Sequence, residues 1–464
     1  MTAAGTGPES TRILRAMKMS NDASSGVATT DARVAVIGLG YVGLPLAVDL
    51  AESGREVLGI DASDDRLASI RAGRSYIDDV SDERLAAALG SGSLRAHSPS
   101  DQREHATAVF ICVPTPVTAS REPDLGPIRA AAEGVRRTLR PGDLVVLQST
   151  TYPGTTMGPL RELLEADGLV AGRDFDLAFS PERVSPGEGR PSSSIPRLVG
   201  GISPEATRRA ADLLRPISPS VTELSSPDAA ELAKLFENVF RNVNIALVNE
   251  LALICERLGL DVWEVIGGAS TKPFGFMPFY PGPGVGGHCI PVDPYYLAAR
   301  AREVGFHERF IETAGDINSR MPEHVIGLVT AALNARGKAV RGATVLVIGV
   351  AFKPDVSDDR NSPARPIIGG LRDAGAHVTY HDPRLPTFSL ADEHDAGPAP
   401  ELTSVDLAEA LAAGPDCVVI VTPHGGLDWD GVFSSADLVV DTRNASAGRV
   451  LRPGQVLRLG GGWS

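Results

Sequence analysis

The sequence has few cysteines, and none of them lies close to another. Its 464 residues contain four, Cys112, Cys255, Cys289 and Cys417, with no CxxC pair. This spacing predicts neither a disulfide framework nor a zinc site, and we expect no bound metal. Unpaired thiols are typical of proteins that work in a reducing cytoplasm, where we expect this one.

The sequence also lacks an apolar run long enough to span a membrane, and it has no excess of basic residues. Residues 1–30 have no continuous apolar core of the kind found in signal peptides, and we expect a flexible leader there. Lys and Arg number 44 against 58 Asp and Glu, which gives a net charge of −14. Because nucleic acid is bound through many cationic contacts, this balance argues against such a partner. Any anionic ligand needs a local cluster of cations.

Two separate stretches alternate short apolar strands with helices. This pattern is typical of parallel, doubly wound sheets, whose buried strands are continuous apolar runs. The first stretch has predicted strands at 33–37, 56–60, 108–113, 144–147 and 176–179, with helices at 82–89 and 128–139 among the segments between them. The second has predicted strands at 343–348, 377–380, 417–421 and 438–440.

A long amphipathic segment separates the two stretches. From Leu232 to Leu258 apolar residues recur at helical spacing, with Ser226 as a suitable N-terminal cap and Gly259 as a suitable stop. The segment is too long for a helix that packs on one sheet. We therefore predict an α/β fold in which two Rossmann-like, doubly wound domains are joined by a central helical domain with a long spine helix. The predicted domains span residues 31–224, 225–325 and 326–464, and the spine helix is expected to form a homodimer.

The first predicted strand leads into Gly38-x-Gly40-x-x-Gly43 and then a helix. One glycine allows the tight turn, one lets the backbone approach a pyrophosphate, and one lets the helix pack closely on the strand. Asp61 follows at the ~20-residue distance at which a carboxylate binds ribose hydroxyls. Because a carboxylate there repels a 2′-phosphate, the pattern predicts NAD rather than NADP. Arg66 either pairs with the cofactor phosphates or is exposed to solvent.

Cys289 differs from the other cysteines, which lie in apolar strands or in the long helix, where cysteine packs as a small hydrophobe. It lies in a Gly- and Pro-rich stretch, 281–293, whose backbone can come close to a ligand. A thiol there, with Asp293 four residues later, is suited to covalent catalysis. His288 is adjacent, but adjacent side chains rarely form the pair that a cysteine protease needs, and no triad signature accompanies it.

Three further groups of polar residues are candidates for a site. One face of the long helix carries Lys234, Asn238, Arg241 and Asn242. This face is either a solvated surface or, if a carbonyl is bound to Cys289, a source of hydrogen-bond donors to the oxyanion that forms there. Thr150 follows a predicted strand, at the edge where ligands of open α/β sheets bind. Glu182 also follows a strand and is either catalytic or part of a surface salt bridge.

These motifs together resemble the UDP-glucose/GDP-mannose dehydrogenase family from about residue 33 to residue 454. In chain order they are GLGYVGLP at 38–45, VPTP at 113–116, STTYPGTT at 149–156, SPER at 180–183, the helix from Lys234 to Arg241, PGPGVGGHC at 281–289, and GVAFKPD at 349–355 with RNSPA at 360–364. The resemblance implies an NAD-binding, a central dimerisation and a UDP-sugar-binding domain. It also implies a four-electron oxidation of the C6 hydroxymethyl of a nucleotide sugar to a carboxylate, with two NAD used in succession, for polysaccharide or glycoconjugate precursors.

The resemblance also implies roles for individual residues. Cys289 matches the nucleophile that captures an aldehyde as a thiohemiacetal, which is then oxidised to a thioester. Lys234 and Asn238 match the groups that stabilise the oxygen anion. Thr150 and Asp293 match the groups that hold the catalytic water, and Glu182 matches the carboxylate that assists thioester hydrolysis. The NAD matches are Gly38, Gly40, Tyr41, Val42, Gly43, Asp61, Arg66, Thr115 and Thr150. The nucleotide-sugar matches are Arg183, Val184, Lys234, Asn238, Arg241, Phe352, Lys353 and Arg360. Four of these cations, Lys234, Arg241, Lys353 and Arg360, should converge on one cleft.

Within the family, the His288-Cys289 pair and the PGPG approach are similar to dehydrogenases of UDP-N-acetyl sugars. REPD at 121–124, STTYP at 149–153 and KPFGF at 272–276 are most similar to UDP-N-acetylglucosamine 6-dehydrogenases. UDP-N-acetylmannosamine dehydrogenases are the second candidate, and UDP-glucose dehydrogenases are a further alternative. Where many relatives carry an arginine that reaches a neighbouring subunit's substrate, this chain offers Lys272. Two other classes remain as alternatives, a two-electron hydroxyacid dehydrogenase and a non-catalytic NAD-sensing protein.

Overall fold

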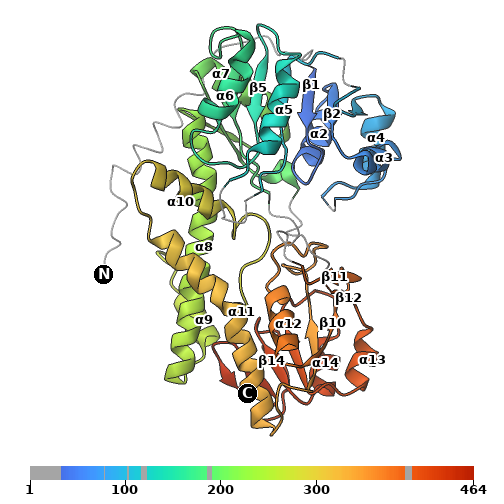
Figure 1. Cartoon of the computed structure of the whole chain (residues 1–464), viewed down its shortest axis with the longest axis vertical. Coiled ribbons are helices and arrows are strands. Elements are labelled where there is room, and N and C mark those ends of the chain that lie inside the picture. The colour runs from blue at the N-terminus through green and yellow to red at the C-terminus, as the bar shows by residue number, and fades with distance from the viewer. Residues whose placement is uncertain (1–32, 78, 102–103, 117–122, 185–190, 392–399) are drawn as a thin grey trace.

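The computed structural model describes residues 33–464 except 78, 102–103, 117–122, 185–190 and 392–399. The predicted leader and two residues of the REPD stretch lie outside this part of the chain. Figure 1 shows two α/β lobes, one from the first half of the chain and one from its last third, with the helices α8 to α11 beside them. The predicted α/β fold with a central helical region is confirmed.

The N-terminal lobe is built on an eight-stranded sheet in the order β3-β2-β1-β4-β5-β6-β7-β8. Every neighbouring pair is parallel except β6 with β7. The strands are β1 Val34–Ile37, β2 Val57–Ile60, β3 Leu94–His97, β4 Ala108–Ile111, β5 Leu144–Leu147, β6 Asp176–Phe179, β7 Arg197–Gly201 and β8 Val221–Leu224. The helices are α2 Gly43–Glu52, α3 Asp64–Arg71, α4 Asp82–Gly90, α5 Gly126–Arg136, α6 Arg161–Leu164 and α7 Pro204–Leu214.

The register of this sheet brings the predicted site segments to one edge. Ile37 at the end of β1 pairs with Ile60 of β2 on one side and with Ile111 of β4 on the other. The chain therefore leaves all three strands at the same level, and the strand order reverses at β1, where open α/β sheets bind ligands. Alternate residues of β1 pack into separate cores on the two faces of the sheet, as a doubly wound fold requires.

The central region consists of α8 Pro227–Leu258, α9 Val262–Ser270, α10 Asp293–Glu303 and α11 Phe310–Ala335. The hydroxyl of Ser226 accepts a hydrogen bond from the N–H of Ala229 at 3.2 Å and so caps α8, while Gly259 ends it in the left-handed conformation at φ 70°. Both predicted ends of the long helix are confirmed. Among the described residues, no helix combines the length and the apolar character needed to cross a bilayer.

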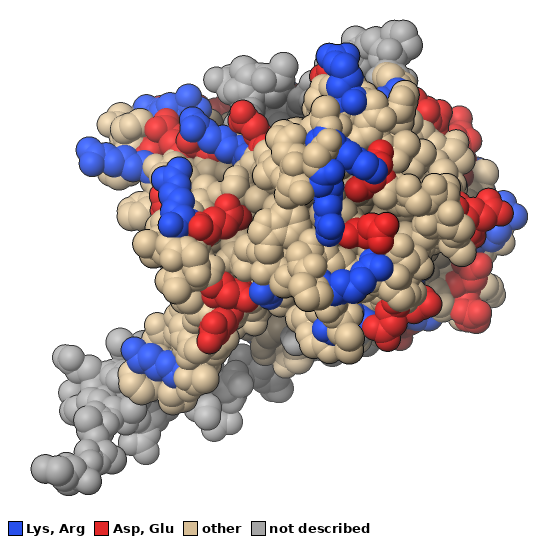
Figure 2. Space-filling model, turned by 90° about the horizontal axis from the view of Figure 1, so that it is seen from below, with Lys and Arg blue, Asp and Glu red and all other residues tan. Residues whose placement is uncertain are grey.

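The C-terminal lobe has a six-stranded sheet in the order β10-β9-β13-β14-β15-β16. Its strands are β9 Thr344–Ile348, β10 His377–His381, β13 Cys417–Ile420, β14 Val439–Asp441, β15 Val456–Arg458 and β16 Gly462–Trp463. A separate pair, β11 Thr387–Ser389 and β12 Glu401–Thr403, lies beside it, and the helices are α12 Ala364–Asp373, α13 Leu407–Ala412 and α14 Trp429–Ser435. On the face in Figure 2, basic and acidic side chains are interspersed.

Candidate active site

The turn after β1 is the predicted dinucleotide cradle, and its three glycines have different surroundings. Gly38 has a φ of +87°, and a Cβ on it would lie 2.8 Å from the carbonyl oxygen of Cys112. A Cβ on Gly43 would lie 1.8 Å from the carbonyl oxygen of Gly38. A Cβ on Gly40, by contrast, would have no atom of the described residues within 4 Å. The chain itself requires Gly38 and Gly43, whereas Gly40 keeps a space clear beside the N-terminus of α2.

The N-terminus of α2 and the end of β2 complete the cradle. In the described structure no side chain caps α2 after Val42, so N–H groups of its first turn can meet an anion. Asp61, which is 5% exposed, accepts hydrogen bonds from the backbone N–H of Leu39 at 2.7 Å and of Ser63 at 2.8 Å. Arg66 lies 3.5 Å from the same carboxylate, as its ion-pair partner. Because a carboxylate has about four acceptor positions, Asp61 retains capacity for ribose hydroxyls.

Two more predicted segments meet where β4 and β5 end. The hydroxyl of Ser149 donates to the carbonyl of Val113 at 2.7 Å, which joins the STTYPGTT and VPTP segments. Thr150 follows directly and is partly buried. The carbonyl of Thr115 accepts a hydrogen bond from the hydroxyl of Tyr296, on α10. This bond ties the first helix after the cysteine to the N-terminal lobe, and sequence reasoning missed Tyr296.

The Cys289 loop, residues 281–292, lies between the central helices and the C-terminal lobe. The carbonyl of Cys289 accepts a hydrogen bond from the N–H of Asp293 at 2.8 Å, in the turn that begins α10. The N–H of Gly287 donates to the carbonyl of Arg360 at 2.9 Å. The nucleophile predicted from the sequence is therefore held on one side by a central helix and on the other by the C-terminal lobe.

Opposing influences act on the thiol of Cys289. Burial and, to a smaller extent, the nearby carboxylate of Asp293 raise its pKa to about 11, against the lowering influence of Lys234, Arg241 and Arg360. Three of the four cations expected to converge thus act on the cysteine, two from α8 and one from the C-terminal lobe. Such a cluster is what an anionic diphosphate needs in an acidic protein.

Beside the cysteine, α8 and α10 share a buried polar pair. The side-chain amide of Asn238 donates to the carboxylate of Asp293, and Arg241 donates to the side-chain oxygen of Asn238. Asp293 is 3% exposed, and burial raises its pKa to about 6, against the lowering influence of Lys234, the Asn238 hydrogen bond and Arg241. Lys234 is 5% exposed, and its amine makes no hydrogen bond or ion pair within the described residues. Its amine therefore remains available to a substrate oxygen.

Glu182, after β6, is held by four hydrogen bonds. One carboxylate oxygen accepts from the backbone N–H of Arg183 at 2.7 Å and of Val184 at 3.0 Å. The other accepts from the side chain of Gln148 at 3.1 Å and from the guanidinium of Arg197 at 3.2 Å. Arg197 is 2% exposed, so the ion pair is internal rather than on the surface. Sequence reasoning missed both Gln148 and Arg197.

Arg183, a predicted substrate residue, points to α8. Its guanidinium forms an ion pair with Glu237 at 2.6 Å and donates to the carbonyl of Pro196 at 2.9 Å. The structure thus gives Arg183 two partners within the chain, and its contact with substrate stays a prediction.

Glu231 is a further buried carboxylate that sequence reasoning missed. It is fully buried on α8 and accepts hydrogen bonds from the N–H of Gly154 at 2.7 Å and from the N–H and hydroxyl of Thr156 at 2.9 Å and 2.6 Å. Burial raises its pKa to about 7. Glu231 therefore fixes the segment that carries Thr150 to the long helix. The only local sign of it is a charged residue among apolar neighbours.

The stretch after β9 places the remaining predicted sugar residues. A Cβ on Gly287 would lie 2.9 Å from the ring of Phe352, so that ring packs against the Cys289 loop. The guanidinium of Arg360 binds Asp358, with Nε 2.9 Å from one carboxylate oxygen, and its carbon lies 5.0 Å from the centre of the Tyr41 ring. Tyr41 belongs to the turn after β1, so the two lobes touch at this contact. Lys353 follows Phe352 and is partly buried.

Three family models match successive parts of the chain. They are the UDP-glucose/GDP-mannose dehydrogenase family's NAD binding domain at residues 32–218, its central domain at 228–320 and its UDP binding domain at 346–447. The chain belongs to this family. As a member, it has the NAD-binding domain of a nucleotide-sugar dehydrogenase, and the cradle fits that cofactor, with space at Gly40 and a carboxylate at Asp61.

Relatives in bacteria and archaea extend over most of the chain. A UDP-N-acetyl-D-glucosamine 6-dehydrogenase of Pseudomonas aeruginosa is 38% identical over 371 residues, 79% of this chain and 86% of its own. A UDP-N-acetyl-D-mannosamine dehydrogenase of Pyrococcus horikoshii is 35% identical over 419 residues, 89% of this chain and 95% of its own. A solved structure of UDP-D-ManNAc dehydrogenase from Pyrococcus horikoshii has a TM-score of 0.81 at 34% identity, over 93% of this chain and 99% of that one.

Proposed function

We propose that this chain oxidises the C6 hydroxymethyl of a UDP-N-acetylhexosamine to the carboxylate, with UDP-N-acetylglucosamine as the favoured substrate. The observation that carries the proposal is the placement of Cys289 among Lys234, Arg241 and Arg360, beside the Asn238–Asp293 pair. A two-electron dehydrogenase has no use for a thiol there. A four-electron oxidation does, because the second oxidation passes through a thioester.

NAD, when bound, accepts one hydride in each of the two oxidations. Cys289, as the thiolate, adds to the C6 aldehyde and forms a carbon–sulfur bond. Lys234 and Asn238 donate hydrogen bonds to the oxygen that becomes anionic. Loss of hydride from this thiohemiacetal leaves a thioester on Cys289. Water then cleaves the carbon–sulfur bond, which releases the carboxylate and regenerates the thiol.

Asp293 and Thr150 hold the water that takes part in these proton transfers, and Glu182 assists hydrolysis. The pKa of about 6 for Asp293 supports its part, since a group that titrates near neutrality exchanges protons readily. The four hydrogen bonds on Glu182 keep its carboxylate in one orientation. Lys353 and Arg360 bind the diphosphate.

The substrate is tested by NADH production on UDP-glucose, UDP-N-acetylglucosamine, UDP-N-acetylmannosamine and UDP-N-acetylgalactosamine. We expect the highest kcat/KM on UDP-N-acetylglucosamine. Relatives named for glucosamine and mannosamine sugars are similarly close, so UDP-N-acetylmannosamine is the second candidate. A dominant rate on UDP-glucose would contradict the N-acetyl assignment.

The electron count is tested by stoichiometry. Two NADH should form for each sugar consumed, with no aldehyde released. About one NADH with free aldehyde would instead indicate a two-electron dehydrogenase. NAD binding without turnover on any of the four sugars would indicate a non-catalytic NAD-sensing protein.

We also propose that the protein is a homodimer, with domain boundaries near residues 224 and 325, in the cytoplasm. The support for the dimer is a row of apolar side chains exposed along one side of α8, namely Leu232, Phe236, Phe240, Leu247, Ile254 and Leu258. A second copy of this helix would cover them. The support for the compartment is that all four cysteines are free thiols.

A further inference from the structure

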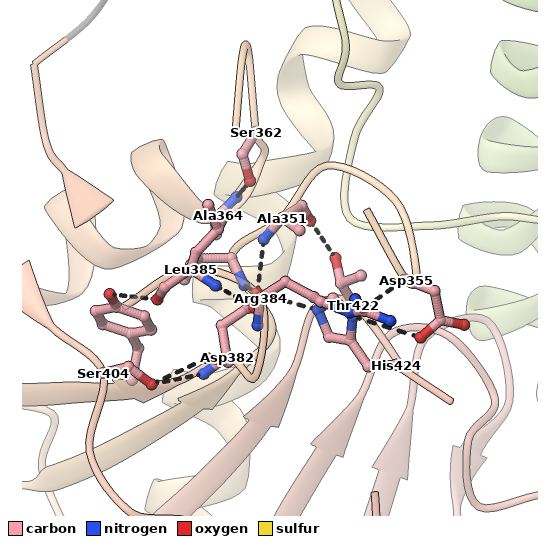
Figure 3. A network of polar contacts seen from close by, with 12 residues as sticks. Ala351, Asp355, Ser362, Ala364, Asp382, Arg384, Leu385, Ser404, Thr422 and His424 are labelled. Carbon is pink, nitrogen blue, oxygen red and sulfur yellow. Dashed lines mark hydrogen bonds and ion pairs between the residues drawn. The ribbon is translucent and has the colours of Figure 1, made fainter. Parts of the chain in front are cut away.

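We propose that His424, in the C-terminal lobe, is a positioning residue for the UDP-sugar. It acts through the Phe352 loop, residues 349–361, which carries Phe352, Lys353 and Arg360. The proposal rests on the assignment of that loop to the sugar nucleotide in the proposed function. Figure 3 shows His424 between Asp382 and Asp355, beneath the loop.

The Phe352 loop begins in the same way as the NAD cradle of the other lobe. Asp382 follows β10, the strand next to β9, and accepts hydrogen bonds from the N–H of Val350 at 2.8 Å and of Ala351 at 2.9 Å. In the N-terminal lobe Asp61 follows β2, next to β1, and accepts from the N–H of Leu39. Each lobe therefore places one buried carboxylate beneath the turn after its first strand.

The two carboxylates differ in what else they bind. Asp61 forms an ion pair with Arg66, whose side chain is 44% exposed, so its surroundings open to solvent. The side chain of Asp382 is fully buried, and one of its oxygens lies 3.0 Å from Nε2 of His424, which is also fully buried. His424 thus occupies an oxygen of Asp382, whereas the carboxylate of Asp61 retains capacity for a ribose hydroxyl. The second lobe therefore uses Asp382 and His424 to fix its own Phe352 loop.

The hydrogen bonds define the tautomer of His424. Its Nδ1 accepts from the backbone N–H of Asp355 at 3.1 Å, so the ring proton is on Nε2, which donates to Asp382. Asp355 has a φ of 62°, which is uncommon outside glycine, and its carboxylate accepts from the N–H of Gly425 at 2.9 Å. The hydroxyl of Thr422 donates to the carbonyl of Ala351 at 2.7 Å.

These contacts fix the loop on both sides of the residues assigned to the substrate. Ala351 is held before Phe352, and Asp355 is held two residues after Lys353. Between these two anchors the ring of Phe352 packs against Gly287 of the Cys289 loop. A change at His424, which bonds to Asp355 and Asp382, would release the second anchor and let Phe352 and Lys353 shift.

The test uses three substitutions in the full chain. His424→Asn keeps an oxygen where Nδ1 accepts from Asp355, and His424→Gln keeps a donor where Nε2 reaches Asp382. His424→Phe removes both contacts. His377→Gln, at an exposed position on β10, is the matched control. The readouts are the Kd of UDP by calorimetry, kcat, the KM values of sugar nucleotide and NAD, and Tm.

We expect His424→Phe to weaken UDP binding and raise the sugar-nucleotide KM by about tenfold, or about 1.4 kcal/mol, with the NAD KM and kcat within about twofold of wild type. His424→Asn should bind UDP more tightly than His424→Gln, because Asp355 is the anchor nearer to Lys353. An unchanged UDP Kd in folded His424→Phe overturns the proposal, as does an equal loss of UDP and NAD affinity. If His424→Phe does not fold, equal UDP affinity of wild type, Asn and Gln variants overturns it.

UDP binding is measured without NAD or a sugar. The role of His424 and the proposed oxidation of a UDP-sugar can therefore be contradicted independently of each other. A wild-type chain that binds UDP but oxidises none of the four sugars contradicts the proposed function and leaves the UDP comparison intact. Full turnover with unchanged UDP affinity in His424→Phe contradicts only the role of His424.

Discussion

The side-chain amide of Asn238 donates a hydrogen bond to the carboxylate of Asp293, and both residues are buried beside Cys289. The bond links the middle of α8 to the first residue of α10. It stabilises the ionised form of Asp293, whereas burial stabilises the neutral form more strongly, which leaves a pKa of about 6. A carboxylate that titrates so close to neutrality beside the nucleophile predicts a pH dependence.

Below this pKa Asp293 is protonated and loses its capacity to accept a proton from water. We therefore expect kcat/KM to fall as the pH drops through about 6. Asp293→Asn should remove this limb of the profile and lower kcat by about 10²- to 10⁴-fold. Asp316→Asn, an exposed position on α11, is the control and should leave the profile unchanged. A wild-type limb that persists in Asp293→Asn would assign the titration to another group.

The thiol of Cys289 should react slowly at neutral pH in the absence of ligands. Its pKa of about 11 predicts that the rate of alkylation by iodoacetamide keeps rising with pH beyond the ordinary range of cysteine. Lys234→Met removes a cation that lowers this pKa and should shift the profile to still higher pH. Labelling is followed by mass spectrometry on the peptide that carries Cys289, with the buried Cys417 as an internal control. A downward shift in Lys234→Met would contradict the placement of the lysine.

Substitutions at two glycines of the cradle should affect folding and cofactor binding separately. Gly43→Ala puts a Cβ against the carbonyl of Gly38 and should lower Tm by several degrees. Gly40→Ala puts a Cβ into the space beside α2, so Tm should stay close to wild type while the Kd of NAD rises about tenfold or more. Calorimetry with NAD and thermal unfolding measure the two effects. Unchanged NAD affinity in Gly40→Ala would mean that the pyrophosphate does not approach this residue.

The exposed row on α8 predicts that charge will dissociate the dimer. Phe236 and Leu247 are 63% and 60% exposed in the single chain. The double variant Phe236→Glu, Leu247→Glu should elute with the mass of one chain, 48.6 kDa, whereas wild type elutes with twice that mass. Val450→Glu introduces the same charge at a residue that is 98% exposed and should leave the dimer intact. Light scattering coupled to gel filtration measures the mass of each variant in solution. A monomeric wild type would contradict the proposed dimer.

Much of the fold follows from apolar runs in the sequence. The strands β1, β2, β4, β5 and β13 are buried at almost every position, so continuous apolar runs located them. By contrast, β3 and β8 lie at the edges of the sheet and include charged residues, so nothing in their composition marks a strand. Edge strands bury only part of their surface, and the apolar signal is correspondingly weak.

The site was predictable where glycine or cysteine makes a segment unusual, as around Gly40 and Cys289. The residues that hold the site segments in place were not predictable, because their partners lie far away in the chain. Arg197 reaches Glu182 across 15 residues, and Glu231 reaches Gly154 across 77. Such contacts exist only once the sheet and α8 are assembled, and a charged residue among apolar neighbours does not show which distant segment it binds.

The contact between Arg360 and the ring of Tyr41 joins the loop proposed for the sugar nucleotide to the turn that fits NAD. A ligand that changed the geometry of this contact would change the site of the other ligand. If NAD changes the affinity for UDP by some factor, UDP must change the affinity for NAD by the same factor, since the two form a closed thermodynamic cycle. Positive coupling would favour the complex that holds both ligands over the two complexes that hold only one.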